Sequence, residues 1–458
     1  MRLSNILAST AVVAGSLVSA ELDPIVIKGS KFFYKTNGTE FFMRGVAYQE
    51  DFSSNGTTSG SDNYKDPLAN VDNCKRDIPL LQELRTNTIR VYAIDPKKDH
   101  SECMKMLDDA GIYVVADLGE PKTSINRDDP KWDDELYERY TTVIDELAQY
   151  SNVLGFFAGN EVTNNKSNTE ASAFVKAAMK PSTSGVTTST LGVEIPASKN
   201  PDMMPLSNIQ GLQHPRFFAD GGIVYMYFQE ENDYGLVKIE NDKAKKLEDF
   251  KYLQKQMQKV DPDGVQMSDY KPTNTALQAC PTSRVWKSNK DLPPTPNREL
   301  CNCIVKSLSC VANDKIDDED LGDLFSTVCG LSEEACTGIA TDPEKGVYGA
   351  YSMCSPREKL SFAFNSYYEE QSAKGNGQNA CDFKGSAKRQ SPIEPSGTCS
   401  SLIEQAGKDG KGSVTSVPNG SSSSAASPMA ISPLNLNFLQ LVAYLLCAAM
   451  AGAGVILL

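Results

Sequence analysis

Short apolar runs alternate with amphipathic stretches over the first third of the chain. Four runs have the length and composition of buried strands: Phe41–Ala47, Thr88–Ile94, Ile112–Leu118 and Val153–Ala158. Between them, apolar residues recur at helical spacing in three stretches: Asp77–Leu84, Cys103–Ala110 and Trp132–Tyr150. Largely apolar strands that alternate with helices are typical of parallel sheets. The pattern predicts an α/β fold, and the chain length favours a (β/α)8 TIM barrel over an open sheet.

Polar side chains follow these strands at the end where barrel enzymes carry their active sites. The fourth strand is followed by Asn160 and Glu161, and the second and third strands end near Asp95 and Asp117. A carboxylate at the mouth, preceded by an amide that can hold a sugar hydroxyl, suits glycoside chemistry. The alternative is that Glu161 is only a charge at the start of a helix.

An aromatic lining is expected on the same rim. The run Gly221–Phe228 reads as a further strand, and it contains Tyr225 and Tyr227. At helical spacing the two tyrosines would belong to the core; on a strand, one of them should face inward. A tyrosine offers a sugar both an apolar face and a hydroxyl group.

Charge and histidine content exclude several classes of function. The chain has 45 Lys and Arg against 59 Asp and Glu, a formal net charge of −14, which argues against nucleic-acid binding. Its two histidines, His100 and His214, are far apart in the sequence, so we expect no histidine-based metal site and no cofactor. Carboxylates are the expected catalytic groups.

Both ends of the chain look like targeting segments. Residues 1–20 have a basic start, an apolar run and small residues before Glu21, which predicts a secretory signal peptide. Residues 384–426 read as a Ser/Gly-rich linker, and 427–458 as an uncharged apolar tail. A polar spacer and an apolar tail predict a GPI-anchor signal that is removed, with a tail-anchored helix as the alternative. Sequons at Asn37, Asn55, Asn165 and Asn419 fit a secreted surface protein, and we expect glycosylation at the first three.

The strand-end motifs resemble those of the fungal glycoside hydrolase family 72, the GPI-anchored 1,3-β-glucanosyltransferases of the cell wall. The matching segments are Arg44–Gln49, Asn87–Ile94, Thr123–Pro130, Asn152–Asn165 and Gly221–Phe228. The resemblance implies a retaining mechanism on β-1,3-glucan, which serves as donor and acceptor, with Glu161 as the acid/base and Asn160 holding the sugar. It also implies a donor-binding lining made by Tyr92, Gly119, Glu120, Pro121, Lys122, Thr123, Ser124, Ile125, Asn126, Arg127 and Tyr225.

The sequence departs from the family at the nucleophile. A barrel unit takes roughly 30 residues, so about 120 should separate the fourth strand from the eighth. Only 63 residues separate Glu161 from Val224, and residues 180–215 show no strand–helix alternation. The Ser-Glu-Tyr-Gly-Cys segment that the family places after its seventh strand is missing, and Glu194 does not replace it. We therefore expect a barrel that is incomplete between its fourth and eighth strands, spanning residues 21–265.

The cysteines indicate the same gap. Twelve cysteines suit an oxidising compartment, and Cys447 would be lost with the tail, which leaves an odd number. Cys74 and Cys103 make one plausible pair, and eight others form a dense group: Cys301, Cys303, Cys310, Cys329, Cys336, Cys354, Cys381 and Cys399. Cys280 is left over, and the resemblance implies that its partner lies in the missing stretch. An intron read through or an exon lost would account for both the shortened barrel and the odd number of cysteines.

The cysteine-rich segment resembles the X8 module, a carbohydrate-binding module of family 43. We place it at residues 296–383, after a connector at 266–295, as a small, mainly α unit braced by disulfides. Zinc is the alternative use of the thiols, but no histidine lies nearby. Two functions remain: a glucan-elongating transferase, or an inactive, GPI-anchored glucan-binding wall protein.

Overall fold

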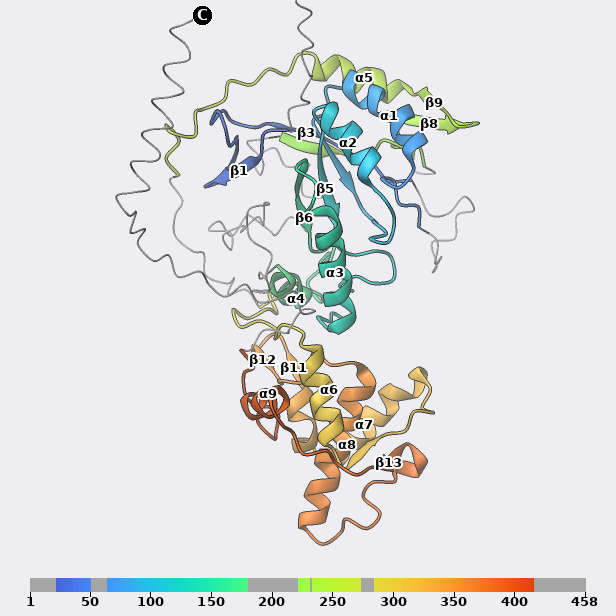
Figure 1. Ribbon diagram of the computed structural model, residues 1–458, viewed down its shortest axis with the longest axis vertical. Helices are drawn as coiled ribbons and strands as arrows, with labels where there is room; N and C mark the ends of the chain where they lie inside the picture. The colour runs from blue at the N-terminus through green and yellow to red at the C-terminus, as the bar shows by residue number, and fades with distance from the viewer. Residues whose placement is uncertain (1–21, 51–63, 180–220, 231–232, 273–283, 416–458) are drawn as a thin grey trace, which may run out of the picture. The chain divides into compact units, whose positions relative to one another are not determined.

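The protein is described by a computed structural model (Figure 1), which defines residues 22–50, 64–179, 221–230, 233–272 and 284–415. The predicted signal peptide and apolar tail lie outside these ranges, as do Asn55, Cys280, Glu194 and His214. None of the helices in these ranges is long and apolar enough to cross a membrane.

The core of the first module is a five-stranded parallel sheet in the order β6-β5-β4-β3-β7. Its strands are β3 (Met43–Ala47), β4 (Thr88–Val91), β5 (Tyr113–Asp117), β6 (Val153–Phe157) and β7 (Gly221–Val224). All five fall inside the segments predicted as strands. The first four follow each other as barrel strands do, and β7 takes the place of the eighth because it pairs with β3. The barrel described here is therefore partial, as the short spacing predicted.

Helices cover one face of this sheet (Figure 1). They are α1 (Val71–Glu83), α2 (Ser101–Asp109), α3 (Asp134–Leu147) and α4 (Ala171–Ala178). Apolar side chains of the strands, such as Val46 and Val114, pack with those of the helices, such as Leu81 and Val143, in one buried cluster. The predicted helix at Asp77–Leu84 was too short: α1 starts at Val71, because the side chain of Asn70 caps the backbone N–H groups of its first turn.

An N-terminal hairpin that the sequence did not reveal packs against the opposite face of the sheet. It consists of β1 (Ile25–Lys28) and β2 (Lys31–Tyr34). Ile25 belongs to a buried cluster with the strand residues Tyr113, Val115 and Leu154, which lie on the face away from the helices. After β7 the module is completed by β8 (Val237–Glu240), β9 (Lys243–Lys246) and α5 (Glu248–Met257).

The cysteine-rich module is mainly helical. Its main elements are α6 (Arg298–Ser307), β10 (Cys310–Ala312), α7 (Leu321–Leu331), α8 (Pro356–Ala373), β13 (Ala387–Arg389) and α9 (Thr398–Ala406), with short pieces η2 (Asp318–Asp320), η3 (Glu334–Ile339), β11 (Thr341–Asp342), β12 (Val347–Tyr348) and η4 (Phe383–Gly385). The boundary predicted at 383 was wrong. Strand β13 pairs with β10, and α9 packs in the module's core through Leu402, so the linker starts later than residue 384.

All ten cysteines predicted to form disulfides do so. Cys74 pairs with Cys103, and the module contains Cys301–Cys354, Cys303–Cys399, Cys310–Cys381 and Cys329–Cys336. Three of the module's bonds start in or just after α6, at Cys301, Cys303 and Cys310, and so join this segment to later elements. This pairing could not be derived from spacing.

We expect the longest of these crosslinks to matter most for the module's stability. The Cys303–Cys399 bond spans 96 residues, and crosslinks over longer loops restrict the unfolded chain more. A Cys303→Ser/Cys399→Ser double variant should lose about 4 kcal/mol of unfolding free energy. Denaturant unfolding measures this loss. The matched control is Cys329→Ser/Cys336→Ser, which opens a span of only 7 residues and should cost less; equal losses would contradict the loop-length argument.

Candidate active site

Glu161 lies just beyond the end of β6, on the carboxyl-end rim of the sheet. Its backbone has a φ of +50°, in the left-handed region that non-glycine residues seldom adopt. The side chain is 34% exposed, and its Oε2 lies 3.8 Å from Nη2 of Arg127, which belongs to the loop that follows β5. A partly exposed carboxylate on a strained backbone at this rim is typical of a functional site rather than of a helix start.

Arg90 links Asn160, the neighbour of Glu161, to the buried carboxylate of Asp117. Arg90 lies on β4, is 2% exposed and makes two hydrogen bonds of 2.8 and 2.7 Å to Asp117 at the end of β5. Its Nη2 also donates to Oδ1 of Asn160 at 3.2 Å. The carboxylate predicted near the rim at Asp117 is therefore committed to a buried ion pair.

Tyr92 stands directly over this pair. Its ring centroid lies 4.2 Å from the Arg90 guanidinium carbon, and the ring of Phe157 lies 4.3 Å from the same atom. Burial raises the pKa of the Tyr92 hydroxyl, Arg90 opposes the rise, and nearby carboxylates including Glu161 add to it. The hydroxyl therefore stays protonated at neutral pH and can donate to a sugar oxygen.

Gln49 fixes the backbone beneath Tyr92. Its Oε1 accepts from the backbone N–H groups of Tyr92 and Ala93 at 3.1 and 3.2 Å, and its Nε2 donates to the carbonyl of Lys65 at 2.7 Å. Gln49 was part of a matching motif but was not predicted as a site residue. Its role is visible only once β3 and β4 lie side by side.

The loop at residues 119–127 is held from below by α3. Arg139 donates to the carbonyls of Leu118 and Gly119 at 3.1 and 3.4 Å. Within the loop, Ile125 is buried, whereas Pro121, Lys122, Ser124 and Asn126 are exposed at the surface. A rigid attachment with polar groups outward suits a binding loop, and Arg127 brings the loop to Glu161.

The two tyrosines that follow the end of β7 at Val224 have different surroundings. Tyr225 is 51% exposed, and its hydroxyl lies 3.4 Å from Oε2 of Glu230. The charge of Glu230 also helps to raise the pKa of Tyr92, so Tyr225 and Tyr92 border the same region. Tyr227 is fully buried and donates to Asp77 of α1 at 2.8 Å.

The structure thus brings Glu161, Asn160, Tyr92 and Arg127 together, and Tyr225 borders them. The catalytic role predicted for Glu161 stays a prediction. The sheet that the structure describes has no seventh barrel strand, so the nucleophile remains unassigned, and the stretch where it was expected lies outside the described residues.

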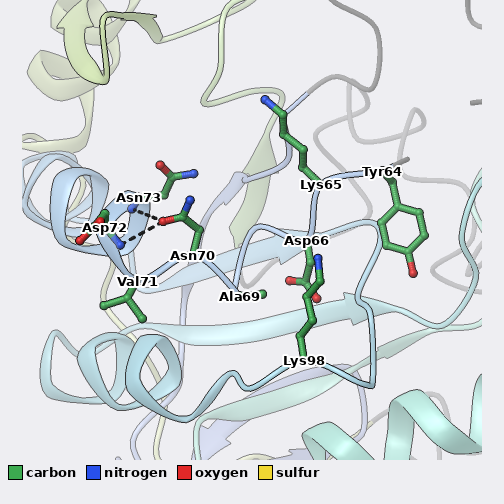
Figure 2. A pocket seen from close by; sticks show the side chains of 9 residues that line it. All are labelled: Tyr64, Lys65, Asp66, Ala69, Asn70, Val71, Asp72, Asn73 and Lys98. Atoms are coloured by element: carbon green, nitrogen blue, oxygen red, sulfur yellow. Dashed lines mark hydrogen bonds between the residues drawn. The ribbon is translucent and has the colours of Figure 1, made fainter. Parts of the chain in front are cut away.

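An open cavity of about 440 Å³ lies elsewhere, at the N-terminus of α1 (Figure 2). Its lining is Tyr64, Lys65, Asp66, Ala69, Asn70, Val71, Asp72, Asn73 and Lys98. It contains none of the predicted site residues. Its polar groups are in part already used, since Asn70 accepts from the backbone N–H groups of Asp72 and Asn73.

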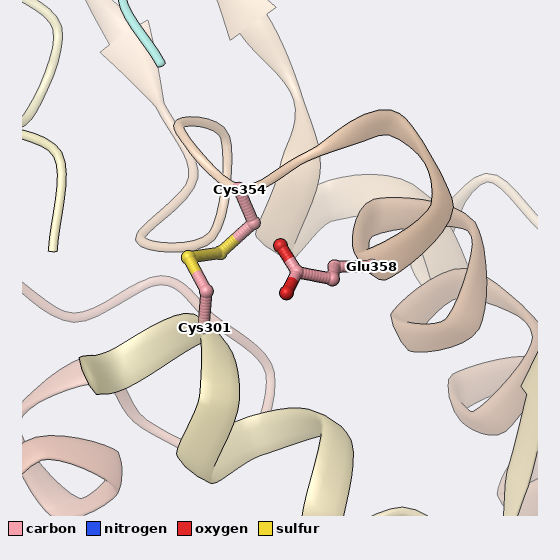
Figure 3. Close-up of side chains that lie close together, drawn as sticks. All are labelled: Cys301, Cys354 and Glu358. Atoms are coloured by element: carbon pink, nitrogen blue, oxygen red, sulfur yellow. A yellow bond between two sulfur atoms is a disulfide. The ribbon is translucent and has the colours of Figure 1, made fainter. Parts of the chain in front are cut away.

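One group of side chains in the cysteine-rich module has the composition of a metal site. Cys301, Cys354 and Glu358 lie within 4.8 Å of one another (Figure 3). The two sulfur atoms form a disulfide, however, and Glu358 accepts hydrogen bonds from Ser355 and Arg298. A disulfide offers no thiolate, so this group does not fit a zinc ion.

Two of the four sequons lie in the described ranges. Asn37 and Asn165 are exposed, and each accepts a hydrogen bond from the hydroxyl of its own sequon, Thr39 and Ser167. Both side chains are therefore accessible from solvent, and their glycosylation stays a prediction.

The sequence of this site matches a known family. Residues 14–197 and 209–261 match glycoside hydrolase family 72, described as glucanosyltransferase, and residues 308–388 match the X8 domain. The chain is 53% identical to a 1,3-beta-glucanosyltransferase of Arthroderma benhamiae, with 100% of both chains covered. The chain belongs to the family 72 glucanosyltransferases.

Other members of this family are similar over most of their length. The 1,3-beta-glucanosyltransferase gas1 of Schizosaccharomyces pombe is 36% identical, with 88% of this chain and 86% of the relative covered. The structure of Saccharomyces cerevisiae Gas2p in complex with laminaripentaose superimposes with a TM-score of 0.62 at 31% identity, and covers 80% of this chain and 97% of that one.

The alignment with the Arthroderma protein is longer than this chain. It runs over 545 positions, 87 more than the 458 residues of this chain. At roughly 30 residues for each strand–helix unit, 87 positions correspond to about three units. The excess therefore has the length of the three barrel strands that were predicted to be missing.

Proposed function

We propose that the protein is a 1,3-β-glucanosyltransferase that cleaves β-1,3-glucan and joins the released chain to a second glucan chain. The observation that carries the proposal is the group at the end of β6, where Glu161 lies beside Arg127 and where Arg90 contacts both Asn160 and Tyr92. Membership of family 72, and the binding of laminaripentaose by Gas2p, support the substrate.

In this reaction Glu161 serves first as an acid and then as a base. As a carboxylic acid it protonates the oxygen of the glycosidic bond that breaks, and as a carboxylate it takes the proton from the hydroxyl of the incoming sugar. A glycosyl-enzyme forms on a second carboxylate between the two steps. Asn160 and Tyr92 hold the sugar next to the bond, and the loop 119–127 with Tyr225 lines the donor site.

A second function is supported by the 87-position gap and the partial barrel. If the chain supplies no nucleophile, it binds glucan at the same rim and through its X8 module without turnover. The location proposed for both functions is the same: secretion, removal of residues 1–20, and attachment to the plasma membrane or wall through a GPI lipid after loss of residues 427–458.

Transfer can be tested directly on the mature chain. Residues 21 to 410, incubated with reduced laminari-oligosaccharides, should yield products longer than the donor, as measured by mass spectrometry. A Glu161→Gln variant should lower this rate by a factor of about 10² or more, because a general acid and base contributes this much. The matched control is Glu170→Gln, a nearby glutamate at the start of α4, which should keep the rate.

The two functions give different outcomes. Binding of laminaripentaose without any product supports the glucan-binding protein, and absence of both binding and product rules out both functions. Sequencing the transcript across residues 179–221 locates the cause: a longer message with a Ser-Glu-Tyr-Gly segment would show that the active protein contains the missing strands.

A further inference from the structure

Arg90 has four partners that together leave its guanidinium no freedom. Nε and Nη2 donate to the two carboxylate oxygens of Asp117, and Nη2 uses its other hydrogen for Oδ1 of Asn160. The rings of Tyr92 and Phe157 both lie against the guanidinium. Since Arg90 is 2% exposed and Asp117 is 4% exposed, water is excluded from the ion pair between them.

We infer that Arg90 is a positioning residue, which orients the Asn160 amide so that its NH2 group faces the substrate. A guanidinium only donates hydrogen bonds, so the amide atom that it contacts must be the oxygen. The NH2 group is then directed away from Arg90, and Asn160 is exposed at the rim. The inference rests on the proposed function, since it takes the substrate to be a sugar chain.

The orientation has a chemical consequence. An amide that is free to flip can donate to a sugar oxygen or accept from a sugar hydroxyl. Fixing it in one of these two orientations on binding costs part of the binding free energy. With its oxygen turned toward Arg90, Asn160 presents its NH2 group to the substrate, so it favours a sugar oxygen that accepts at that position. Asp117 neutralises the charge of Arg90, so the orientation is imposed without placing a net positive charge beside Glu161.

A purely structural role is the competing explanation, because removing one partner of a buried ion pair destabilises any protein. An Arg90→Lys variant keeps the charge for Asp117 but loses the planar fork that reaches Asn160. Arg44→Lys is the matched control: Arg44 lies on the neighbouring strand β3 and donates to the carbonyl of Arg85 at 2.8 Å, away from Asn160.

Binding of laminaripentaose, measured by calorimetry, tests the coupling between the two residues. Arg90→Lys should raise Kd about tenfold, because one hydrogen bond is worth about a factor of ten. In the Asn160→Ala background the same change should alter Kd less than twofold. Equal effects in both backgrounds would show that Arg90 does not act through Asn160, and would overturn the inference.

A second measurement needs no substrate and separates this inference from the proposed function. In the free protein with 15N-labelled asparagine, the NH2 signals of Asn160 are identified by their loss in Asn160→Asp. Arg90→Lys should shift these signals, and Arg44→Lys should leave them in place. Unchanged Asn160 signals in Arg90→Lys would refute the positioning role even if the protein binds glucan, whereas a shift without glucan binding would uphold it and refute the proposed substrate.

Discussion

The Asp77→Ala variant is expected to lose about 3–5 kcal/mol of its free energy of unfolding. Asp77 is 0% exposed and accepts from the hydroxyl groups of Tyr48 at 2.9 Å and Tyr227 at 2.8 Å. Arg76 also donates to both of its oxygens, at 2.8 and 2.6 Å. Removing the carboxylate leaves two buried hydroxyl groups and a half-buried guanidinium without their acceptor, and each such group is costly.

The loss should be seen in urea unfolding at neutral pH. Asp72→Ala is the matched control, because Asp72 lies exposed in the first turn of the same helix and should change stability by less than about 1 kcal/mol. Should Asp77→Ala not fold, Tyr227→Phe removes only one hydrogen bond and should cost about 1 kcal/mol. Equal stability of Asp77→Ala and the wild type would show that the network contributes nothing.

The same network connects the stability of the fold with the candidate active site. Tyr48 directly follows β3, Asp77 lies on α1, and Tyr227 lies two residues after Tyr225. Asp77 therefore ties the segment that carries Tyr225 to the helix layer, and it does so across 150 residues of sequence.

The second large effect is expected at His100, which lies between two carboxylates. Its Nδ1 lies 2.8 Å from Oε1 of Glu146 and its Nε2 lies 2.9 Å from Oδ2 of Asp66, and the imidazole is fully buried. Two carboxylates can only accept, and a neutral imidazole has a single N–H, so this geometry requires the protonated ring. Burial alone would lower the pKa of His100, but the hydrogen bonds to Asp66 and Glu146 outweigh it and raise the pKa.

A raised histidine pKa gives a defined dependence of stability on pH. The stabilisation is complete below about pH 6.5, the ordinary value, where the histidine is charged in the folded and unfolded chain alike. It is lost as the pH rises through the higher pKa of the folded protein. Two other charged residues lie near this site: Asp99, next to His100 in the sequence, and Lys98, which lines the same cavity as Asp66. The hydroxyl of Tyr150 lies 3.4 Å from Glu146.

Melting temperatures between pH 5 and pH 9 measure this effect. The wild type should lose stability from pH 6.5 upward, and His100→Gln should lose about 3 kcal/mol at pH 6 and show a flatter dependence above it. His214→Gln, which removes the other of the two histidines, is the control and should keep the wild-type profile. A His100→Gln protein with the wild-type profile would show that His100 is not the group that titrates.

The sequence predicted the local structure of the barrel well. Each of the five parallel strands lies in a segment selected by its apolar pattern, because the burial of a strand depends on which residues are apolar along a few neighbouring positions. The first turn of α1 is polar and does not show the apolar helical pattern, so the helix begins earlier than predicted. The hairpin at β1 and β2 and the final helix α9 were missed, since short polar-flanked elements have little periodicity of their own.

The candidate site was predicted in part. Glu161, Asn160, Tyr92 and the loop to Arg127 follow strand ends, and parallel strands bring their carboxyl ends to one rim, so position in the sequence was sufficient to group them. Gln49 and Arg90 were not assigned to the site, and His100 was set aside. Their partners are distant in sequence, and nothing in the residue type shows whether a polar side chain will meet one.

The sequence by itself determined the order of strands and helices, the family, the odd cysteine and the shortened distance between the fourth and last strands, because these depend on local patterns and on counting. Only the tertiary structure decided which side chains meet: Arg90 with Asn160 across 70 residues, Asp77 with Tyr227 across 150, and Cys303 with Cys399 across 96. Such pairs depend on how the strands and helices are placed relative to one another in space. A buried polar group is stable only where that placement supplies its hydrogen-bond partner.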